Sequence, residues 1–183
     1  PFRIDRCDAS VVNDMEKLHL YLVRHCESLG NRENIFQGQL DLDISATGEK
    51  QLALLALRFR NIPIDAVYSS PLKRAYKTAE AVDLYHSLPI IKLPELMEVD
   101  VGALSGMKLD KAFADYPVFA ERWQNSPQNC IFPEGETTAE VYDRTKKALA
   151  RVKADCMGQT AVITSHGFLL RCMACEILEH DIE

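Results

Sequence analysis

The sequence predicts an α/β protein of three layers, an α/β/α sandwich in which helices cover both faces of a mostly parallel sheet. Short apolar runs of strand length alternate along the chain with longer segments of helical periodicity. Such alternation places successive strands in parallel and packs the intervening helices above and below the sheet. The 183 residues fit one domain over residues 1–183 and are enough to bury a sizeable core.

Apolar runs and helix signals place three strands and two helices in the first half of the chain. The runs expected to be strands cover residues 18–23, 64–68 and 90–93. Ser45 is typical of an N-cap, and the amphipathic helix that it begins is expected to end before Pro63. Pro71 stands near the start of a second helix, where its missing N–H costs nothing, and this helix is expected to reach about Tyr85.

The second half of the chain continues the same alternation. In order, the expected elements are a helical segment over 107–126, a loop over 127–135, a long helix over 137–152, a strand over 160–164 and a helix over 168–178. Pro117 should interrupt the helical segment, because proline lacks the N–H that a helix interior needs. Thr137 or Thr138 can cap the long helix.

The net charge restricts the possible partners. A value of −6 argues against binding to nucleic acid, which depends mainly on Lys and Arg. It still permits an anionic substrate if positive charge is concentrated in one cleft. No segment has the length of a transmembrane helix, and no basic region followed by an apolar run marks a signal peptide. We therefore expect no nucleic-acid or membrane partner, and a monomer and a homodimer remain equally open.

The six cysteines show no spacing typical of a disulfide framework. Reduced thiols and a cytoplasmic location are the corresponding expectation. The pair Cys172-x-x-Cys175 lies in an apolar helical pattern and has no second cysteine pair. This context favours packing in the core over metal binding.

Cationic side chains follow three of the predicted strands. The strand over 18–23 leads directly into Arg24 and His25, and the strand over 160–164 leads to His166. The strand over 64–68 is followed by the helix start that contains Arg74. Because ligands of open parallel sheets bind at the carboxyl ends of the strands, these side chains should form one anion-binding site.

Six ordered motifs give the chain a specific resemblance to a known family. They are Arg24-His25-x-Glu27-Ser28-x-x-Asn31, Gln37-Gly38-x-x-Asp41, Ser69-Ser70-Pro71-Leu72-x-Arg74-Ala75-x-x-Thr78-Ala79, Glu98-x-x-x-Gly102-x-x-x-Gly106, Pro133-x-Gly135-Glu136-Thr137 and Ser165-His166-Gly167. From about Met15 to about Leu178, the sequence resembles the histidine phosphatase superfamily in its phosphoglycerate-mutase-like branch. The resemblance implies the phosphoglycerate-mutase-like fold and a phosphohistidine intermediate.

The resemblance implies a role for each of five catalytic residues. His25 would be the nucleophile, and its attacking nitrogen must be unprotonated while the other nitrogen donates to a fixed acceptor. A backbone carbonyl of the loop that follows the strand could be this acceptor. Arg24 and Arg74 would hold the phosphoryl oxygens, and His166 would donate to them. Glu98 would be the general acid and base, with a nearby phosphate dianion favouring its protonated form.

Polar and glycine residues near these positions are the expected substrate contacts. They are Ser28, Asn31, Gln37, Gly38 and Gly167. Ordinary turn chemistry explains Ser28 nearly as well as substrate binding. No metal or other cofactor is implied, because two arginines and two histidines can supply the positive charge that a metal would bring.

Two departures from the family pattern bear on function. Cys26 stands where the family has Gly, so the loop either tolerates a side chain or is altered. The thiol also raises the alternative of a cysteine nucleophile, which would leave Arg24, Arg74 and Glu98 without roles. Val99-Asp100-Val101 replaces the Arg and Tyr that mutases use on phosphoglycerate, and the long basic insertion of mutases is missing.

These departures favour a phosphomonoester hydrolase that acts on a small phosphorylated metabolite. The alternatives are a phosphoglycerate mutase, and a binding module for a phosphorylated ligand that lost turnover through Cys26. Residues 108–133 are expected to cover the substrate pocket.

The ends of the sequence suggest a circular permutation of the family order. Family members usually have a further strand after the last helix, and residues 1–14 resemble that strand and its approach. Residues 9–12 would then form a strand of the main sheet, with Pro1 close to Glu183. The alternative is an N-terminal extension combined with a shortened C-terminus.

Overall fold

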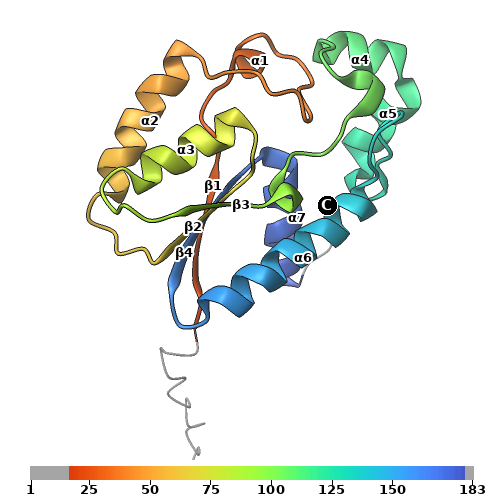
Figure 1. Ribbon diagram of the computed structural model, residues 1–183. Coiled ribbons are helices and arrows are strands. Elements are labelled where there is room, and N and C mark those ends of the chain that lie inside the picture. The colour runs from red at the N-terminus through yellow and green to blue at the C-terminus, as the bar shows by residue number, and fades with distance from the viewer. Residues whose placement is uncertain (1–16, 180–183) are drawn as a thin grey trace, which may run out of the picture.

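The computed structural model describes residues 17–179, which form a three-layer α/β/α sandwich (Figure 1). The sheet consists of β1 (His19–Arg24), β2 (Ala66–Ser69), β3 (Ile90–Lys92) and β4 (Thr160–Ser165). All neighbouring strands are parallel, and their order across the sheet is β1-β4-β2-β3. The predicted fold class is confirmed, and the four strands lie where apolar runs predicted them, with small shifts at their ends.

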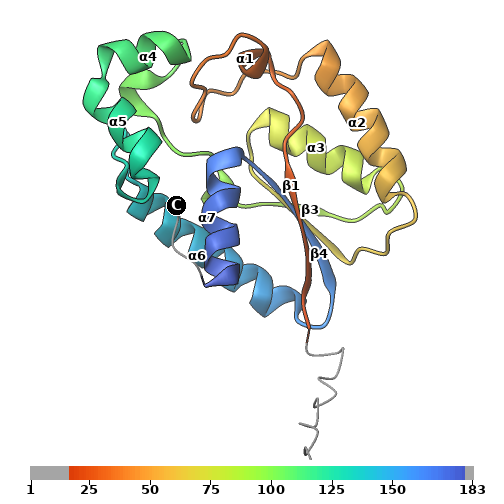
Figure 2. The ribbon, with the colours of Figure 1, turned by 180° about the vertical axis from the view of Figure 1, so that it is seen from behind.

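Helices cover both faces of the sheet because side chains alternate along each strand. Val67 and Val162 point to one face, where they pack with α2 (Ala46–Phe59) and α3 (Lys73–Asp83). Tyr68 and Ile163 point to the other face, against α6 (Thr138–Cys156) and α7 (Gly167–Leu178). Figures 1 and 2 show these helix pairs on opposite sides of the strands.

Side-chain caps begin the two longest helices. The Ser45 hydroxyl accepts a hydrogen bond from the backbone N–H of Gly48 and begins α2, as predicted. For α6, the structure selects Thr137 rather than Thr138, because Thr137 and Glu140 form a reciprocal capping box. Each cap satisfies backbone N–H groups that have no partner within the helix.

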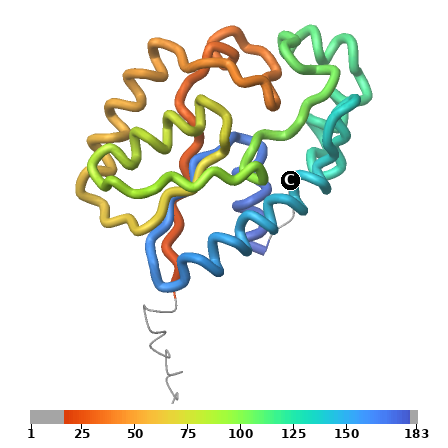
Figure 3. Tube along the Cα trace, viewed as in Figure 1, coloured from red at the N-terminus to blue at the C-terminus, as the bar shows by residue number. Residues whose placement is uncertain are grey.

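The long connection between β3 and α6 consists of short helices that lie beside the carboxyl ends of the strands (Figure 3). Its elements are η2 (Pro94–Leu96), η3 (Gly102–Leu104), α4 (Leu109–Asp115), α5 (Pro117–Asn125) and η4 (Pro127–Asn129). The predicted interruption at Pro117 is confirmed, since α4 ends just before this residue and α5 begins at it. The segment expected to be a loop over 127–135 contains the short turn η4.

Two features complete the comparison with the predictions. The short helix α1 (Leu29–Arg32) was not predicted, because four residues are too few to show helical periodicity. The predicted strand over 9–12 and the expected closeness of the two ends lie outside the described residues. Within residues 17–179, no helix is both long and apolar enough to cross a membrane.

Candidate active site

The two histidines of the predicted site follow neighbouring strands of the sheet. Arg24, the last residue of β1, pairs with Ser165, the last residue of β4. The backbone N–H of His25 donates to the carbonyl oxygen of Ser165 over 2.9 Å, which extends the ladder by one step. The ring centres of His25 and His166 are consequently 5.1 Å apart. The sheet therefore brings together two imidazoles that are far apart in the sequence.

The ring of His25 is held in one orientation by its own loop. Its Nδ1 lies 2.6 Å from the carbonyl oxygen of Cys26, a contact in which Nδ1–H donates and Nε2 retains its lone pair. Burial lowers the pKa of His25 to about 4. The hydrogen bond to Cys26 raises this pKa, whereas the positive charges of Arg74 and Arg24 lower it further. At neutral pH the imidazole is therefore an oriented, neutral nitrogen base.

His166 is fully buried, and its ring has one side-chain hydrogen-bond partner in the part of the chain that the structure describes. Its Nε2 lies 2.8 Å from the hydroxyl oxygen of Ser70. Burial lowers the pKa of His166 well below its usual value, so the ring is neutral and carries one proton. Within the described residues, only His166 Nδ1 and Arg74 Nε are buried side-chain polar atoms without a hydrogen-bond partner.

Arg74 is a buried cation held by backbone carbonyls. Its two terminal nitrogens donate to the carbonyl oxygens of Leu40, over 2.7 Å, and Gly38, over 2.8 Å. Gly38 has a positive φ of 49°, which suits the tight turn that presents its carbonyl. Burial lowers the pKa of Arg74, and the carboxylates of Glu98 and Asp41 oppose this shift. The guanidinium is thus desolvated and rigid before any ligand binds.

Arg24 reaches the same site from the other side. Unlike Arg74 it is exposed, and it lies against the start of α7. A Cβ atom added at Gly167 would lie 3.5 Å from Nε of Arg24, an ordinary van der Waals distance, so the guanidinium lies beside the first residue of α7. The first turn of α7 and the two arginines therefore form a positively polarised surface.

The carboxylate of Glu98 lies over the start of α7. Its oxygens accept hydrogen bonds from the backbone N–H groups of Phe168 and Leu169, each over 3.3 Å, and from its own neighbour Val99 over 3.1 Å. These contacts fix the direction of the side chain, which lines the same pocket as His25 and Arg74. Glu95, which lies within η2, does not line this pocket.

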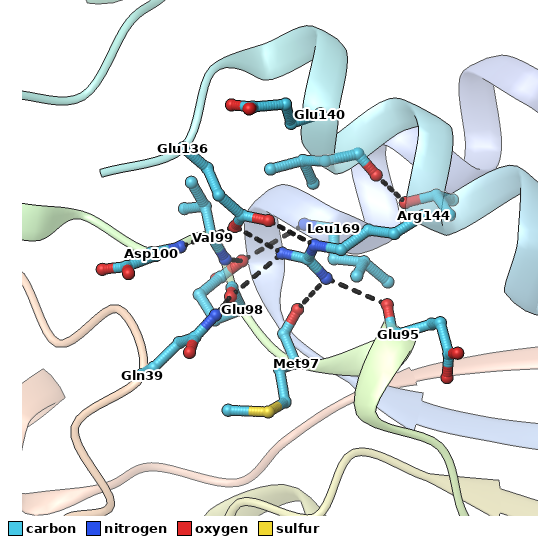
Figure 4. Close-up of polar contacts among 12 residues, drawn as sticks. Gln39, Glu95, Met97, Glu98, Val99, Asp100, Glu136, Glu140, Arg144 and Leu169 are labelled. Carbon is cyan, nitrogen blue, oxygen red and sulfur yellow. Dashed lines mark hydrogen bonds and ion pairs between the residues drawn. The ribbon is translucent and has the colours of Figure 1, made fainter. Parts of the chain in front are cut away.

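A further arginine, not singled out from the sequence, holds the segment that carries Glu98 (Figure 4). Arg144 on α6 donates to the carbonyl oxygens of Glu95 (2.9 Å), Met97 (2.5 Å) and Glu98 (3.1 Å). Its guanidinium also forms a two-point ion pair with Glu136, at 2.8 and 2.9 Å. The only signal in the sequence was a cation on the otherwise apolar face of a predicted helix.

One pocket of about 310 Å³ contains most of the predicted site. Of the ten predicted residues, eight line it: Arg24, His25, Asn31, Gln37, Gly38, Arg74, Glu98 and Gly167. His166 does not line the pocket, but its ring centre is 5.1 Å from that of His25. The remaining wall is largely apolar and includes Val99 and Val101, together with residues that sequence reasoning did not assign to the site: Phe36, Leu109, Trp123, Phe132 and Phe168. Three of these come from the segment expected to cover the pocket.

Ser28 is not among the lining residues. It is fully buried and caps α1, with its hydroxyl oxygen 2.7 Å from Oε1 of Gln37 and 2.8 Å from Oδ1 of Asn31. Its place in the structure corresponds to the turn chemistry that the sequence also allowed. Ser28 therefore orients two side chains that do face the pocket.

The sequence matches a known protein family over most of its length. Residues 20–183 match the model of the histidine phosphatase superfamily, branch 1. The chain belongs to this family.

Its relatives include both phosphatases and mutases by name. The chain is 40% identical over 163 residues to phosphoserine phosphatase 1 of Hydrogenobacter thermophilus, which covers 89% of this chain and 77% of the relative. It is 32% identical over 161 residues to the probable phosphoglycerate mutase GpmB of Escherichia fergusonii, covering 88% and 75%. The solved structure of YhfR from Bacillus stearothermophilus superposes with a TM-score of 0.85 at 26% identity, covering 91% and 82%.

Cys26 leaves the histidine phosphatase site intact. The backbone φ of Cys26 is not positive, so this position does not require glycine. Its N–H donates to the hydroxyl of Thr78 over 3.0 Å, and its side chain is buried against α3. Burial raises the pKa of the thiol, which disfavours the nucleophilic thiolate. The loop tolerates a side chain at this position.

Of the cysteine pair on α7, Cys172 is part of the core, whereas Cys175 is only partly buried. Cys172 is fully buried in a cluster with Phe132 and Phe168, and burial raises its pKa to about 12. Across residues 17–179, no group of three or more His, Cys, Asp or Glu side chains is arranged to hold a metal ion.

Proposed function

We propose that this histidine phosphatase hydrolyses phosphomonoesters of small metabolites through a phosphohistidine at Nε2 of His25. The observation that carries the proposal is the 2.6 Å contact between Nδ1 of His25 and the carbonyl oxygen of Cys26. This contact leaves Nε2 unprotonated and oriented, as nucleophilic attack on phosphorus requires. A pKa lowered to about 4 keeps that nitrogen available at neutral pH.

In the first step, the lone pair of His25 Nε2 forms a bond to phosphorus while the bond to the leaving oxygen breaks. Glu98 supplies the proton that this oxygen needs to depart as an alcohol. The charge on the three phosphoryl oxygens is stabilised by Arg24, Arg74 and His166. The unpartnered Nε of Arg74 and Nδ1 of His166 are two donors suited to this role, because burial strengthens their hydrogen bonds to an anion.

In the second step, water attacks the phosphohistidine from the side that the alcohol has left. Glu98, now ionised, accepts a proton from this water, and the P–N bond breaks to release inorganic phosphate. The lone pair returns to His25 Nε2 and the proton returns to Glu98. No cofactor enters the cycle.

The pocket favours hydrolysis over the mutase reaction. Val99 and Val101 are buried and contribute apolar surface beside Glu98, where a mutase needs cationic and phenolic groups to hold phosphoglycerate. An apolar wall leaves the second anionic end of phosphoglycerate without partners at this position. The relatives named as probable mutases make the mutase reaction the alternative to test.

Variants of single histidines test the proposal. Wild-type protein should hydrolyse phenyl phosphate and form an acid-labile, alkali-stable phosphoenzyme, and His25→Ala should lose both properties. His86→Ala is the matched control, because His86 contacts the carbonyl oxygen of Phe59 outside the pocket, and it should retain both. Full turnover by His25→Ala would refute the mechanism. Binding of phosphate without turnover in wild type would support the binding module, and interconversion of phosphoglycerates would support the mutase.

A further inference from the structure

One cation of the pocket has no part in the proposed chemistry. Arg171 on α7 lines the pocket that contains His25, yet its side chain is exposed and makes no hydrogen bond or ion pair with any described residue. On a helix, a residue four positions after Gly167 and three after Phe168 lies on their side. Arg171 therefore stands at the edge of the site, displaced along α7 from the phosphate-binding end.

Arg171 also lines a second pocket, of about 360 Å³. The two pockets share three residues: Trp123, Phe168 and Arg171. The rings of Trp123 and Phe168 stack, with centres 5.7 Å apart and planes 19° from parallel. The boundary between the two pockets therefore consists of the stacked rings of Trp123 and Phe168 together with the guanidinium of Arg171.

The second pocket has the chemistry of an anion subsite. Its other lining residues are Gln124, Asn125, Pro127 and Gln128, so three side-chain amides share the lining with the guanidinium and no carboxylate belongs to it. Amide N–H groups and an unpaired guanidinium donate hydrogen bonds to anionic oxygens. An anion placed there would meet positive charge without a competing acidic group.

We infer that this second pocket binds a distal anionic group of the substrate, a carboxylate or a second phosphate. The inference rests on the proposed phosphate site at His25. The substrate class is then a phosphomonoester whose leaving group crosses the aromatic pair Trp123–Phe168 through an apolar or planar part and ends in anionic oxygens. Arg171 is the residue that selects this class.

Binding of non-hydrolysable phosphonates tests the inference without depending on turnover. Calorimetry would compare benzylphosphonate with 4-carboxybenzylphosphonate and with p-xylylene diphosphonate, in wild type and in Arg171→Gln. We expect at least one of the doubly anionic ligands to bind wild type about tenfold more tightly than benzylphosphonate, as one charge-assisted hydrogen bond allows. Arg171→Gln should lose this preference and keep its affinity for benzylphosphonate. The response to the two ligands separates carboxylate from phosphate recognition.

Arg58→Gln is the matched control, because Arg58 is an exposed helical arginine that lines neither pocket. It should behave as wild type. A preference that persists in Arg171→Gln, or that is absent from wild type, overturns the inference. Hydrolysis of phenyl phosphate is measured in parallel, and its absence would count against the proposed function while leaving the binding comparison interpretable.

Discussion

Among residues 17–179, the hydroxyl of Ser70 is the only side-chain hydrogen-bond partner of His166, and both residues are fully buried. Ser70 also accepts a hydrogen bond from the N–H of Leu72 over 3.3 Å, so its own proton is free to point at Nε2 of His166. A Ser70 hydroxyl that donates to Nε2 of His166 leaves the single proton of the neutral ring on Nδ1. We propose that Ser70 in this way sets His166 as a hydrogen-bond donor to the phosphoryl group.

We expect Ser70→Ala to release this control of the tautomer. Loss of the hydroxyl should lower kcat/KM about tenfold, the effect of one weakened hydrogen bond to a charged group. Nitrogen-15 NMR of the histidine rings should show a shift of the His166 proton toward Nε2. Ser69→Ala is the control, because the Ser69 hydroxyl contacts the carbonyl oxygen of Ser70 and Thr164 but no imidazole. An unchanged tautomer in Ser70→Ala would contradict this role.

Replacement of Arg144 should separate kcat from KM. Arg144→Met removes the hydrogen bonds that hold three carbonyls around Glu98, so the general acid loses its position while the phosphate-binding arginines keep theirs. We expect kcat to fall by about a hundredfold, as displacement of a catalytic group by about 1 Å can cause, with little change in KM.

Two companion variants define the Arg144 result. Glu136→Gln keeps the shape of the partner but replaces one acceptor oxygen by an amide donor, which weakens the ion pair with Arg144 and the contact to the N–H of Asp100. Its effect should be smaller, because Arg144 keeps its hydrogen bonds to the three carbonyls. Arg151→Met, on the same helix, removes an exposed arginine that pairs with Asp155 and should leave both kinetic constants unchanged. Steady-state kinetics with phenyl phosphate measures all three. A rise in KM with unchanged kcat in Arg144→Met would show that Arg144 acts on substrate binding instead.

Stability should fall as the pH drops below 6.5. The unfolded chain takes up a proton at His25 near pH 6.5, whereas the folded protein excludes it down to about pH 4. The free energy of unfolding is therefore unaffected by this group above pH 6.5. Between pH 6.5 and about pH 4 it falls by on the order of 3 kcal/mol in total, because only the unfolded chain binds the proton. Urea unfolding at pH 7.5 and pH 4.5 measures it. The loss should be smaller in His25→Gln, and an equal loss in both proteins would argue against the lowered pKa.

Cys26→Gly should retain turnover. The residue at position 26 contributes its backbone N–H to Thr78 and its carbonyl to His25, and glycine keeps both groups. Added backbone freedom in the unfolded chain and the loss of a buried side chain should lower the free energy of unfolding by about 1 kcal/mol. Phenyl phosphate hydrolysis and urea unfolding check the two parts. A loss of activity of more than about tenfold, the range of a disturbed catalytic hydrogen bond, would give the thiol a direct role.

The sequence could predict what local patterns encode. The apolar run before Arg24 predicted β1, and the cap at Ser45 predicted the start of α2, because short-range periodicity and capping determine these features. Adjacency of His25 and His166 also followed, since strands of a parallel sheet end on one edge. The expected backbone acceptor for the His25 ring is the carbonyl of the next residue.

Side-chain contacts between elements far apart in the sequence could not be predicted from local patterns. Arg144 meets Glu98 only because α6 packs across η2, and no local pattern encodes that crossing. Ser70 reaches His166 through the pairing of β2 with β4. The wall formed by Trp123 and Phe168 depends on how α5 folds back over α7, which the separate helical patterns did not contain.

The shared register of β1 and β4 has a consequence for how such proteins diversify. An inserted or deleted residue in either strand alone would move one imidazole by about 3.3 Å and turn its neighbours to the opposite face. Length changes in these strands should therefore abolish the proposed reaction, whereas the segment over 108–133, which carries neither imidazole nor Glu98, can vary without disturbing the spacing of the two rings. This segment lines the pocket through Leu109, Trp123 and Phe132, so its exchange between homologues offers a route to new substrates with the reacting side chains kept.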